Sequence, residues 1–219
     1  KVVLFGGKDG QKLCTSGASR YCRDLWEWDE GNTRWERREP TSEDASWPSG
    51  RYGAGMAFDR VGGALLLFGG DGDGVGCGED SDEPCADLWS WRTNTGEWSE
   101  FQPSEEAQWP AARRSPGVIY DVLESSLLVL GDDYLSSSCD DVGSDTCGGV
   151  WQWPSGGDGW YQLRPIQPPS ETVWPTQRIR HSMAWNVRRK VGFLYGGWSG
   201  ESLDDAYEWS TALGLWTQI

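Results

Sequence analysis

The stretches LLLFGG at residues 65–70 and DLWSWR at residues 87–92 decide the fold, because both recur along the chain at a near-constant spacing. The copies of the glycine-ended stretch finish 63, 62 and 65 residues apart, at Gly7, Gly70, Asp132 and Gly197. The tryptophan stretch recurs at residues 24–29, 87–92, 149–154 and 205–210. Seven residues after the second aromatic of that stretch comes another tryptophan, at Trp35, Trp98, Trp160 and Trp216. The chain is therefore built from one unit repeated four times.

Each complete unit is predicted to hold four short β-strands. The tryptophan stretch alternates with period two, and a turn-like link joins it to the next tryptophan strand, so these two strands form a hairpin. An apolar strand precedes the glycine-ended strand in the later units, at residues 53–59, 115–121 and 181–186. It is introduced by Trp-Pro and then an arginine, as Trp47 with Arg51, Trp109 with Arg113, and Trp174 with Arg178. Because so small a unit cannot bury both faces of its sheet, radial stacking into a β-propeller is expected.

Together, the arginine lead-in, the strand ending in Gly-Gly and the aromatic followed by a spaced tryptophan resemble the kelch repeat. The resemblance covers the 219 residues and implies an all-β, kelch-type β-propeller of four four-stranded blades, with strand A of the first blade missing. Within one propeller segment over residues 1–219, the blades are expected at 1–40, 51–103, 113–165 and 178–219. The third copy departs from the family pattern at Asp132, which replaces the second glycine. Since propellers of this family close by pairing strands from both termini, we expect residues outside 1–219, or another chain, to supply the missing strand.

Six cysteines lie in register in the first three units, as Cys14 with Cys22, Cys77 with Cys85, and Cys139 with Cys147. Each pair closes one local loop, whereas equivalent positions in different units are expected to lie far apart, and the fourth unit lacks both members. Three disulfides are therefore predicted, each within its own loop, which indicates a secreted, extracellular or cell-surface protein. Zinc binding is the disfavoured alternative, because the cysteines are widely spaced and these loops contain no histidine.

The long loops that carry the cysteines are expected on one face of the propeller together with the Trp-Pro segments, and binding residues would lie there. The first loop is basic, whereas the second and third are acidic, a mixture that would suit head-to-tail contact between copies. Carboxylates interspersed with glycine suggest a calcium site, whose candidate ligands are Asp71, Asp73, Asp80 and Asp82. The spacing of an EF-hand loop is absent, so a solvated acidic face is the favoured alternative.

Composition limits the chemistry. With 34 acidic and 19 basic residues the chain has a formal net charge of -15, which argues against a nucleic-acid partner and against insertion into anionic membranes. Its one histidine, His181, falls short of the two that copper radical oxidases on kelch-type propellers need. We therefore expect His181 to be a buried, hydrogen-bonded structural residue, and we expect no cofactor other than calcium.

Two groups of side chains are candidates for facing a ligand. One comprises tryptophans that could stack on sugar rings: Trp47, Trp109, Trp174 and Trp198. The other comprises arginines that could capture a carboxylate in a central funnel: Arg51, Arg113 and Arg178. Because the arginines recur in each unit, a structural ion pair or strand anchor is the favoured role for them.

These observations favour a noncatalytic extracellular binding or assembly module that uses its disulfide-pinned loops for protein contact. The expected partner is another protein, or further copies or segments of the same assembly. A carbohydrate-binding propeller is the first alternative, and part of a glycan-active enzyme is the second. In the enzyme alternative no spacing of carboxylates singles out a catalytic pair.

Overall fold

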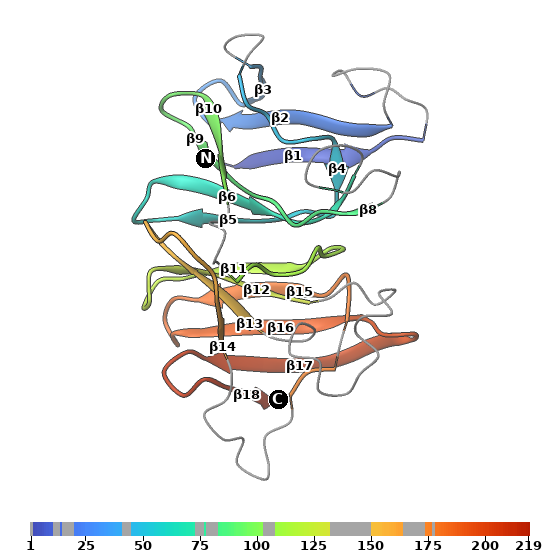
Figure 1. The fold of residues 1–219 in the computed structure, drawn as a ribbon, viewed down its shortest axis with the longest axis vertical. Helices are drawn as coiled ribbons and strands as arrows, with labels where there is room; N and C mark the ends of the chain where they lie inside the picture. The colour runs from blue at the N-terminus through green and yellow to red at the C-terminus, as the bar shows by residue number, and fades with distance from the viewer. Residues whose placement is uncertain are drawn as a thin grey trace.

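The computed structural model describes residues 2–10, 14, 20–40, 45–72, 77, 83–102, 108–131, 150–163, 174–176 and 178–219 (Figure 1). Every regular element in these ranges is a β-strand. No helix in them is long and apolar enough to span a bilayer. The all-β class predicted from the repeat is confirmed.

The strands of the described ranges form a succession of antiparallel sheets along the long axis of the molecule (Figure 1). The first sheet contains β1 (Val3–Lys8), β2 (Tyr21–Asp29) and β3 (Arg34–Arg38). The second contains β5 (Gly55–Asp59), β6 (Ala64–Phe68), β9 (Leu88–Arg92) and β10 (Glu97–Phe101). The third contains β11 (Gly117–Asp121), β12 (Ser126–Leu130), β13 (Val150–Pro154) and β14 (Tyr161–Leu163). The fourth contains β15 (Ser182–Asn186), β16 (Val191–Trp198), β17 (Ser202–Ser210) and β18 (Leu215–Gln218).

This topology is the one that the repeat predicted. In the later sheets the strand order follows the chain, and in the described part of the first sheet the strand before β1 is missing. A small additional sheet joins β4 (Arg51–Tyr52), β7 (Asp71–Gly72) and β8 (Glu83–Pro84) at one end of the second sheet. The assignment of each large sheet to one blade, with the boundaries given above, stays a proposal.

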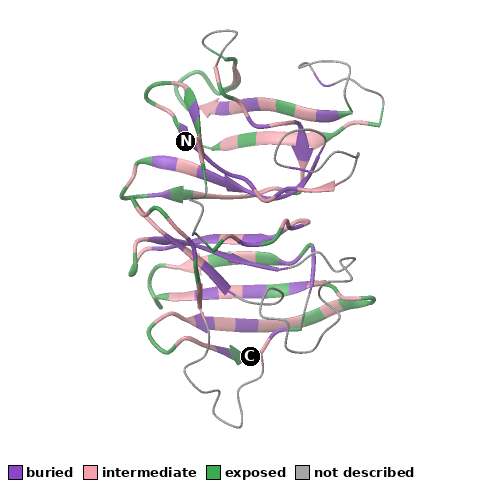
Figure 2. Ribbon diagram, viewed as in Figure 1, coloured by how far each residue is buried: buried purple, intermediate pink, exposed green. Residues whose placement is uncertain are grey.

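The hydrophobic core lies between neighbouring sheets. Along β2 and β17, buried positions alternate with half-buried or exposed ones, so each sheet has two distinct faces (Figure 2). Between the first and second sheets, Phe5 and Leu25 pack with Leu67, Trp91 and Trp98. The interfaces between the later sheets repeat the same arrangement with residues from the same columns. Each interface therefore combines an aliphatic face of one sheet with a tryptophan-rich face of the next.

The strands β5, β11 and β15 lie innermost and contact one another in chain order. Glycine occupies the points where they converge. A Cβ on Gly55 would lie 2.1 Å from Cγ2 of Val118, and one on Gly117 would lie 2.4 Å from Sδ of Met183. The absence of side chains at these positions allows the inner strands to approach more closely than the outer ones, as sheets arranged around an axis require.

The glycine pair that ends the second strand of a sheet has a backbone conformation that other residues rarely adopt. Gly6 and Gly69 have φ angles of 74° and 71°. A Cβ on Gly6 would lie 2.3 Å from the carbonyl oxygen of Arg51, and one on Gly69 would lie 3.0 Å from that of Arg113. The glycine column therefore allows the entry segment of the following sheet to pass directly over the end of the strand.

Replacing Gly6 by alanine should reveal this close approach, with Gly156→Ala as a matched control. The φ angles of the two glycines are 74° and 72°, but a Cβ on Gly156 would meet nothing within 4 Å. Both variants should lose about 1–2 kcal/mol of unfolding free energy from backbone strain. Gly6→Ala should lose about 1–3 kcal/mol more, because of the clash with Arg51. Urea unfolding monitored by tryptophan fluorescence measures the difference, and equal losses would contradict the packing role.

Candidate functional site

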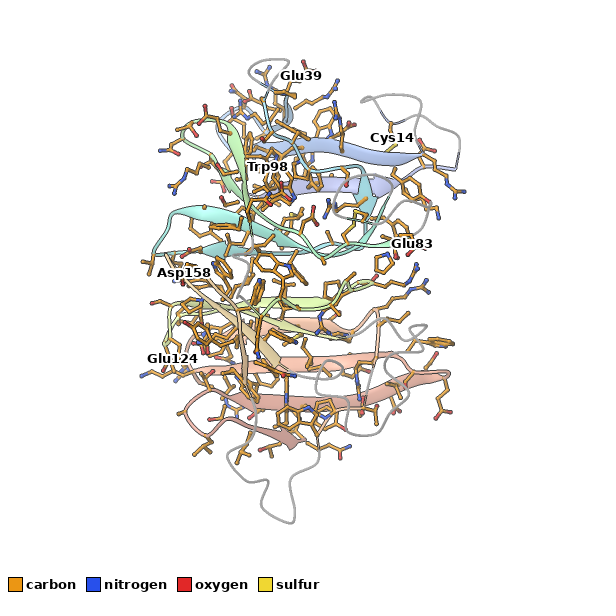
Figure 3. All side chains as sticks on the ribbon, in the orientation of Figure 1. Cys14, Glu39, Glu83, Trp98, Glu124 and Asp158 are labelled. Atoms are coloured by element: carbon orange, nitrogen blue, oxygen red, sulfur yellow. A yellow bond between two sulfur atoms is a disulfide. The ribbon has the colours of Figure 1, made fainter. Side chains whose placement is uncertain are left out.

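The connections between strands emerge on two opposite faces of the molecule. Cys14, between β1 and β2, and Glu83, in β8 between β6 and β9, lie on one side in Figure 3. Glu124 and Asp158, from tight hairpin turns, lie on the other. We call the first side the loop face; it comprises the described parts of the first two cysteine-bearing connections and the arginine lead-ins. The other side carries short turns, such as that between Asp59 and Ala64. The candidate site is therefore the loop face.

A buried arginine fixes the start of each complete sheet on this side. Arg51 is fully buried, and its guanidinium binds both carboxylate oxygens of Asp87, with Nη2 2.6 Å from Oδ2. Its Nη1 also donates to the carbonyl of Gly69, at 3.3 Å. The same carboxylate accepts a 2.6 Å hydrogen bond from Nε1 of Trp89. This node joins Arg51, which lies just before β5, to Gly69 at the end of β6 and to Asp87 at the beginning of β9.

The node recurs in the fourth sheet and, in part, in the third. Arg178 binds both carboxylate oxygens of Asp205, with a 2.8 Å contact between Nη2 and Oδ2. Hydrogen bonding to Arg178 is the main reason why the pKa of Asp205 lies below its usual range. In the third sheet the buried Arg113 donates to the carbonyl of Gly131, and glycine stands at position 149, the aspartate column. Arg51, Arg113 and Arg178, which are candidates for ligand capture, are thus enclosed by protein in this structure.

Trp-Pro segments link each sheet to the next. The indole Nε1 of Trp47 donates a 2.8 Å hydrogen bond to the carbonyl of Arg23 in the preceding sheet. Its ring meets Trp91 of the following sheet edge to face, with centroids 5.7 Å apart. In the next linker, Nε1 of Trp109 likewise donates to the carbonyl of Ala86, just before β9 of the second sheet. The tryptophan of the linker therefore contacts both sheets that it connects.

The other candidates for sugar stacking differ in exposure. Trp109 contacts Trp153 edge to face at 5.8 Å, and Trp174 contacts Trp209 in the same way at 6.1 Å. Trp198, at the end of β16, is 37% exposed. Glycan stacking on these four tryptophans stays a prediction, and the packing of three of them gives those rings a structural role.

Two disulfides lie within their own loops, as the cysteine spacing predicts: Cys14–Cys22 and Cys77–Cys85. Cys139 and Cys147 lie outside the described residues. The Cys85 backbone connects the second loop to the next sheet, because its N–H donates to Gly70 at 2.8 Å and its carbonyl accepts from the N–H of Arg113 at 3.0 Å. The N–H of Gly70 donates to the carbonyl of Arg113 at 2.9 Å and completes this connection. The disulfide loop is thus anchored at its base to the buried arginine segment of its neighbour.

A basic and aromatic cluster marks the loop face beside the first disulfide. Nζ of Lys8 lies 5.3 Å from the ring centroid of Tyr21 and 4.9 Å from that of Tyr52. The guanidinium of Arg20 also lies over Tyr21, and its Nη2 donates to the tyrosine hydroxyl at 3.1 Å. Lys8 and Arg20 are exposed. Sequence reasoning placed basic residues in this loop but missed the tyrosines, which adjoin Cys22 and Arg51 in the chain and belong to no repeated column.

The predicted calcium site falls mostly outside the described residues. Asp71 is buried and forms an ion pair with Arg114, with Nη1 2.6 Å from Oδ1. Asp73, Asp80 and Asp82 are not described. The described part of the chain brings no three histidine, cysteine or acidic side chains together as metal ligands. Calcium binding in this loop therefore stays a prediction.

His181 is buried where the third and fourth sheets meet, as expected. The expectation that this ring forms a hydrogen bond is wrong. Within the described ranges, neither Nδ1 nor Nε2 of His181 has a hydrogen-bond partner. A Cβ on Gly131 would lie 2.6 Å from Cε1 of this ring. Burial, with a smaller contribution from nearby Arg178, lowers the pKa of His181 from 6.5 to about 4. The neutral ring fills space against the glycine column.

Comparison with protein families agrees with this geometry. The family model that matches is described as the KLHDC2/KLHL20/DRC7 Kelch-repeats domain, and it matches residues 1–219. No curated protein matches the chain. The match extends over the first sheet as well as the complete ones, so all the sheets fall within it.

Asp87→Ala should be strongly destabilising, because it leaves the buried guanidinium of Arg51 without its carboxylate. We expect a loss of about 3–5 kcal/mol of unfolding free energy. Arg34→Ala is the control, since it removes a surface ion pair with Glu36 in which the arginine side chain is 67% exposed. This variant should lose no more than about 1 kcal/mol. Urea unfolding of both variants measures the contrast, and similar small losses would show that the node is dispensable.

Stability should fall as the pH drops from 7 to 5, because the unfolded chain binds a proton at His181 more readily than the folded protein. The folded-state pKa of about 4 lies below the usual 6.5, so the neutral ring stabilises the fold above pH 6.5 and this contribution is lost toward pH 4. His181 should account for about 2 kcal/mol between pH 7 and 5. His181→Gln should remove that part of the slope in urea unfolding, while titration of the carboxylates continues in both proteins. An unchanged slope would contradict the assignment.

Proposed function

The chain belongs to the Kelch-repeat family, and from this premise we propose that it is a noncatalytic extracellular module that binds a protein partner through its loop face. Kelch-repeat domains generally mediate contacts between proteins. The observation that carries the proposal is the anchoring of the second disulfide loop, through Cys85, to the buried Arg113 segment. Surface loops fixed to a rigid scaffold are the usual location of binding residues.

Anchoring of the second disulfide loop in the free protein favours tight binding of a partner. A loop that must become ordered on binding costs conformational entropy, which reduces the net binding free energy. The hydrogen bonds of Cys85 with Gly70 and Arg113, and the pairing of β8 with β7, hold the base of this loop in the free protein. A disulfide that closes so short a loop restricts the open chain further, by about 2–3 kcal/mol. The loop base is therefore ordered before a partner arrives.

The chemistry of the loop face favours a partner with charged and aromatic groups of its own. The exposed basic side chains of Lys8 and Arg20 lie over Tyr21, and the second loop contributes the acidic Glu83. Tyrosine and arginine are enriched in the parts of interfaces that contribute most to affinity, and opposite charges at the rim accelerate association. We propose a protein whose contact surface carries an acidic patch opposite Lys8 and Arg20.

An extracellular location fits the disulfides. Cys14–Cys22 and Cys77–Cys85 would be reduced in most cytosolic compartments, whereas an oxidising environment maintains them. The high net negative charge also suits a protein that must stay dispersed in solution. Secretion is part of the proposal, and it supports the choice of secreted or cell-surface proteins as candidate partners.

A binding selection with matched variants tests the loop face. The oxidised chain is immobilised and used to select binders from a displayed library of extracellular protein domains, and affinities are then measured by biolayer interferometry. Lys8→Glu and Arg20→Glu should each weaken the selected binders by about tenfold, equivalent to about 1.4 kcal/mol. Val61→Glu alters a residue that is 67% exposed in a turn on the opposite face, and it should leave binding unchanged. A library without specific binders, or binders sensitive only to Val61→Glu, would overturn the proposal.

A further inference from the structure

The two described disulfides differ in how far solvent reaches them. Cys14–Cys22 joins the first long loop to β2; Cys14 is 9% exposed and Cys22 is half-buried (Figure 3). Cys77 and Cys85 are both 0% exposed. A thiol reduces a disulfide by attacking one of its sulfur atoms, so the rate depends on access to that atom. The first disulfide is therefore the one that a reductant in solution reaches more readily in the folded protein.

The second disulfide is enclosed by the segment that leads into its own sheet. The Ser49 hydroxyl lies 3.2 Å from Sγ of Cys77 and accepts a 2.9 Å hydrogen bond from Nη2 of Arg51. A Cβ on Gly72 would lie 3.0 Å from the same sulfur. A reductant reaches this disulfide only when the segment around Arg51 opens locally. Because Asp87 holds Arg51 in place, that opening is unfavourable and reduction of the second disulfide is slow.

The first disulfide lies beside the basic and aromatic cluster. Tyr21 of β2 pairs with Lys8 of β1, and Cys22 is the next residue of β2. Beyond this pair, the N–H of Asp9 donates to the carbonyl of Arg20 at 2.8 Å. In the described part of the chain these are the last backbone contacts of the hairpin before the disulfide loop. The cluster is therefore held by the end of a hairpin that the first disulfide closes.

The cluster spans the two units that carry the described disulfides. The rings of Tyr21 and Tyr52 stack with their centroids 6.3 Å apart and their planes 14° apart. Tyr52 lies in β4 next to the buried Arg51, in the segment that encloses the second disulfide. Tyr21 lies instead at the hairpin end beside Cys22. Opening the first disulfide alone therefore releases one half of the cluster and leaves the other half fixed.

We propose that Cys14–Cys22 is a redox switch of the loop face, which a dithiol reductant opens before Cys77–Cys85. A thiolate of the reductant attacks Sγ of Cys22, the S–S bond breaks, and Cys14 leaves as a thiolate that takes up a proton. The second thiol of the reductant then attacks the mixed disulfide and releases Cys22 as a thiol, while the reductant becomes a disulfide. Two electrons and two protons pass from the reductant to the protein.

Reduction weakens binding at the loop face. Once the first disulfide is open, the hairpin end frays, and Lys8 and Arg20 lose their fixed positions beside Tyr52. A partner must then order these side chains on binding, so its affinity falls. The second disulfide stays closed and keeps its loop anchored. The effect on affinity rests on the proposed function, whereas the order of opening and the fraying do not.

Differential alkylation of the oxidised 219-residue chain tests the order of opening. Dithiothreitol is added at about 0.1–10 mM, free thiols are trapped with iodoacetamide, and peptide mass spectrometry follows each cysteine pair. Cys14 and Cys22 should become labelled at least about tenfold faster than Cys77 and Cys85, because the buried pair requires local unfolding. Equal rates, or earlier labelling of the buried pair, would overturn the proposal.

Hydrogen exchange tests whether the open disulfide releases the hairpin end. One variant combines Cys14→Ser with Cys22→Ser, and its control combines Cys139→Ser with Cys147→Ser, which removes the same number of cysteines from the third unit. In the first variant the amide of Asp9 should exchange at least about tenfold faster than in the wild type, while the amides of β9 keep their rates. The control should leave Asp9 unchanged.

Circular dichroism establishes whether both variants are folded. An unchanged exchange rate at Asp9 would contradict the switch, since the hairpin end would then be ordered without its disulfide. Global unfolding of the Cys14→Ser and Cys22→Ser variant, or faster exchange in β9 as well, would also contradict it, because the disulfide would then support the whole fold.

Binders selected on the loop face measure the consequence for affinity. A binder that is sensitive to Lys8→Glu should lose about tenfold in affinity for the Cys14→Ser and Cys22→Ser variant, equivalent to about 1.4 kcal/mol, and should bind the control variant like the wild type. Unchanged affinity would overturn the switch and leave the proposed function standing. A library without binders would count against the proposed function alone, and alkylation and exchange would still decide whether the disulfide opens selectively.

Discussion

The structure depends on an arginine buried at the entrance to each complete sheet. A guanidinium in a protein interior is stable only when carboxylate or carbonyl groups satisfy its N–H donors. Arg51 and Arg178 meet this requirement with Asp87 and Asp205, and they thereby fix the relative positions of three strand ends within one sheet. Because the carbonyl of Arg51 also passes closely over Gly6, the same residue sets the distance to the preceding sheet.

Much of this arrangement could be predicted from the sequence, because each part of it recurs. Period-two alternation around Trp89 and Trp91 identifies a strand, and the repeat spacing identifies the sheets and their order. The pairing of Cys77 with Cys85 follows from repetition as well, since both cysteines are absent together from the fourth unit. The recurrence of the arginines also indicated a structural role, because a residue present at the entrance to each complete unit is expected to serve the fold that these units share.

Features that occur once could not be predicted in this way. The tyrosines that flank Lys8 come from different sheets, and their proximity depends on how those sheets pack. His181 was expected to form a hydrogen bond, but its position against Gly131 is set by a backbone approach that no sequence pattern encodes. The aspartate that binds Arg51 lies 36 residues away and was not identified from the sequence, although the pair recurs in the fourth sheet.

Linker tryptophans such as Trp47 have a consequence for how a protein of this kind can evolve. Each unit contains one surface suited to the unit before it and another suited to the unit after it, and the linker that joins them contacts both. A gene duplication that adds one unit therefore supplies the new interface together with the new sheet. The loops lie outside these interfaces, so they are free to diverge between units.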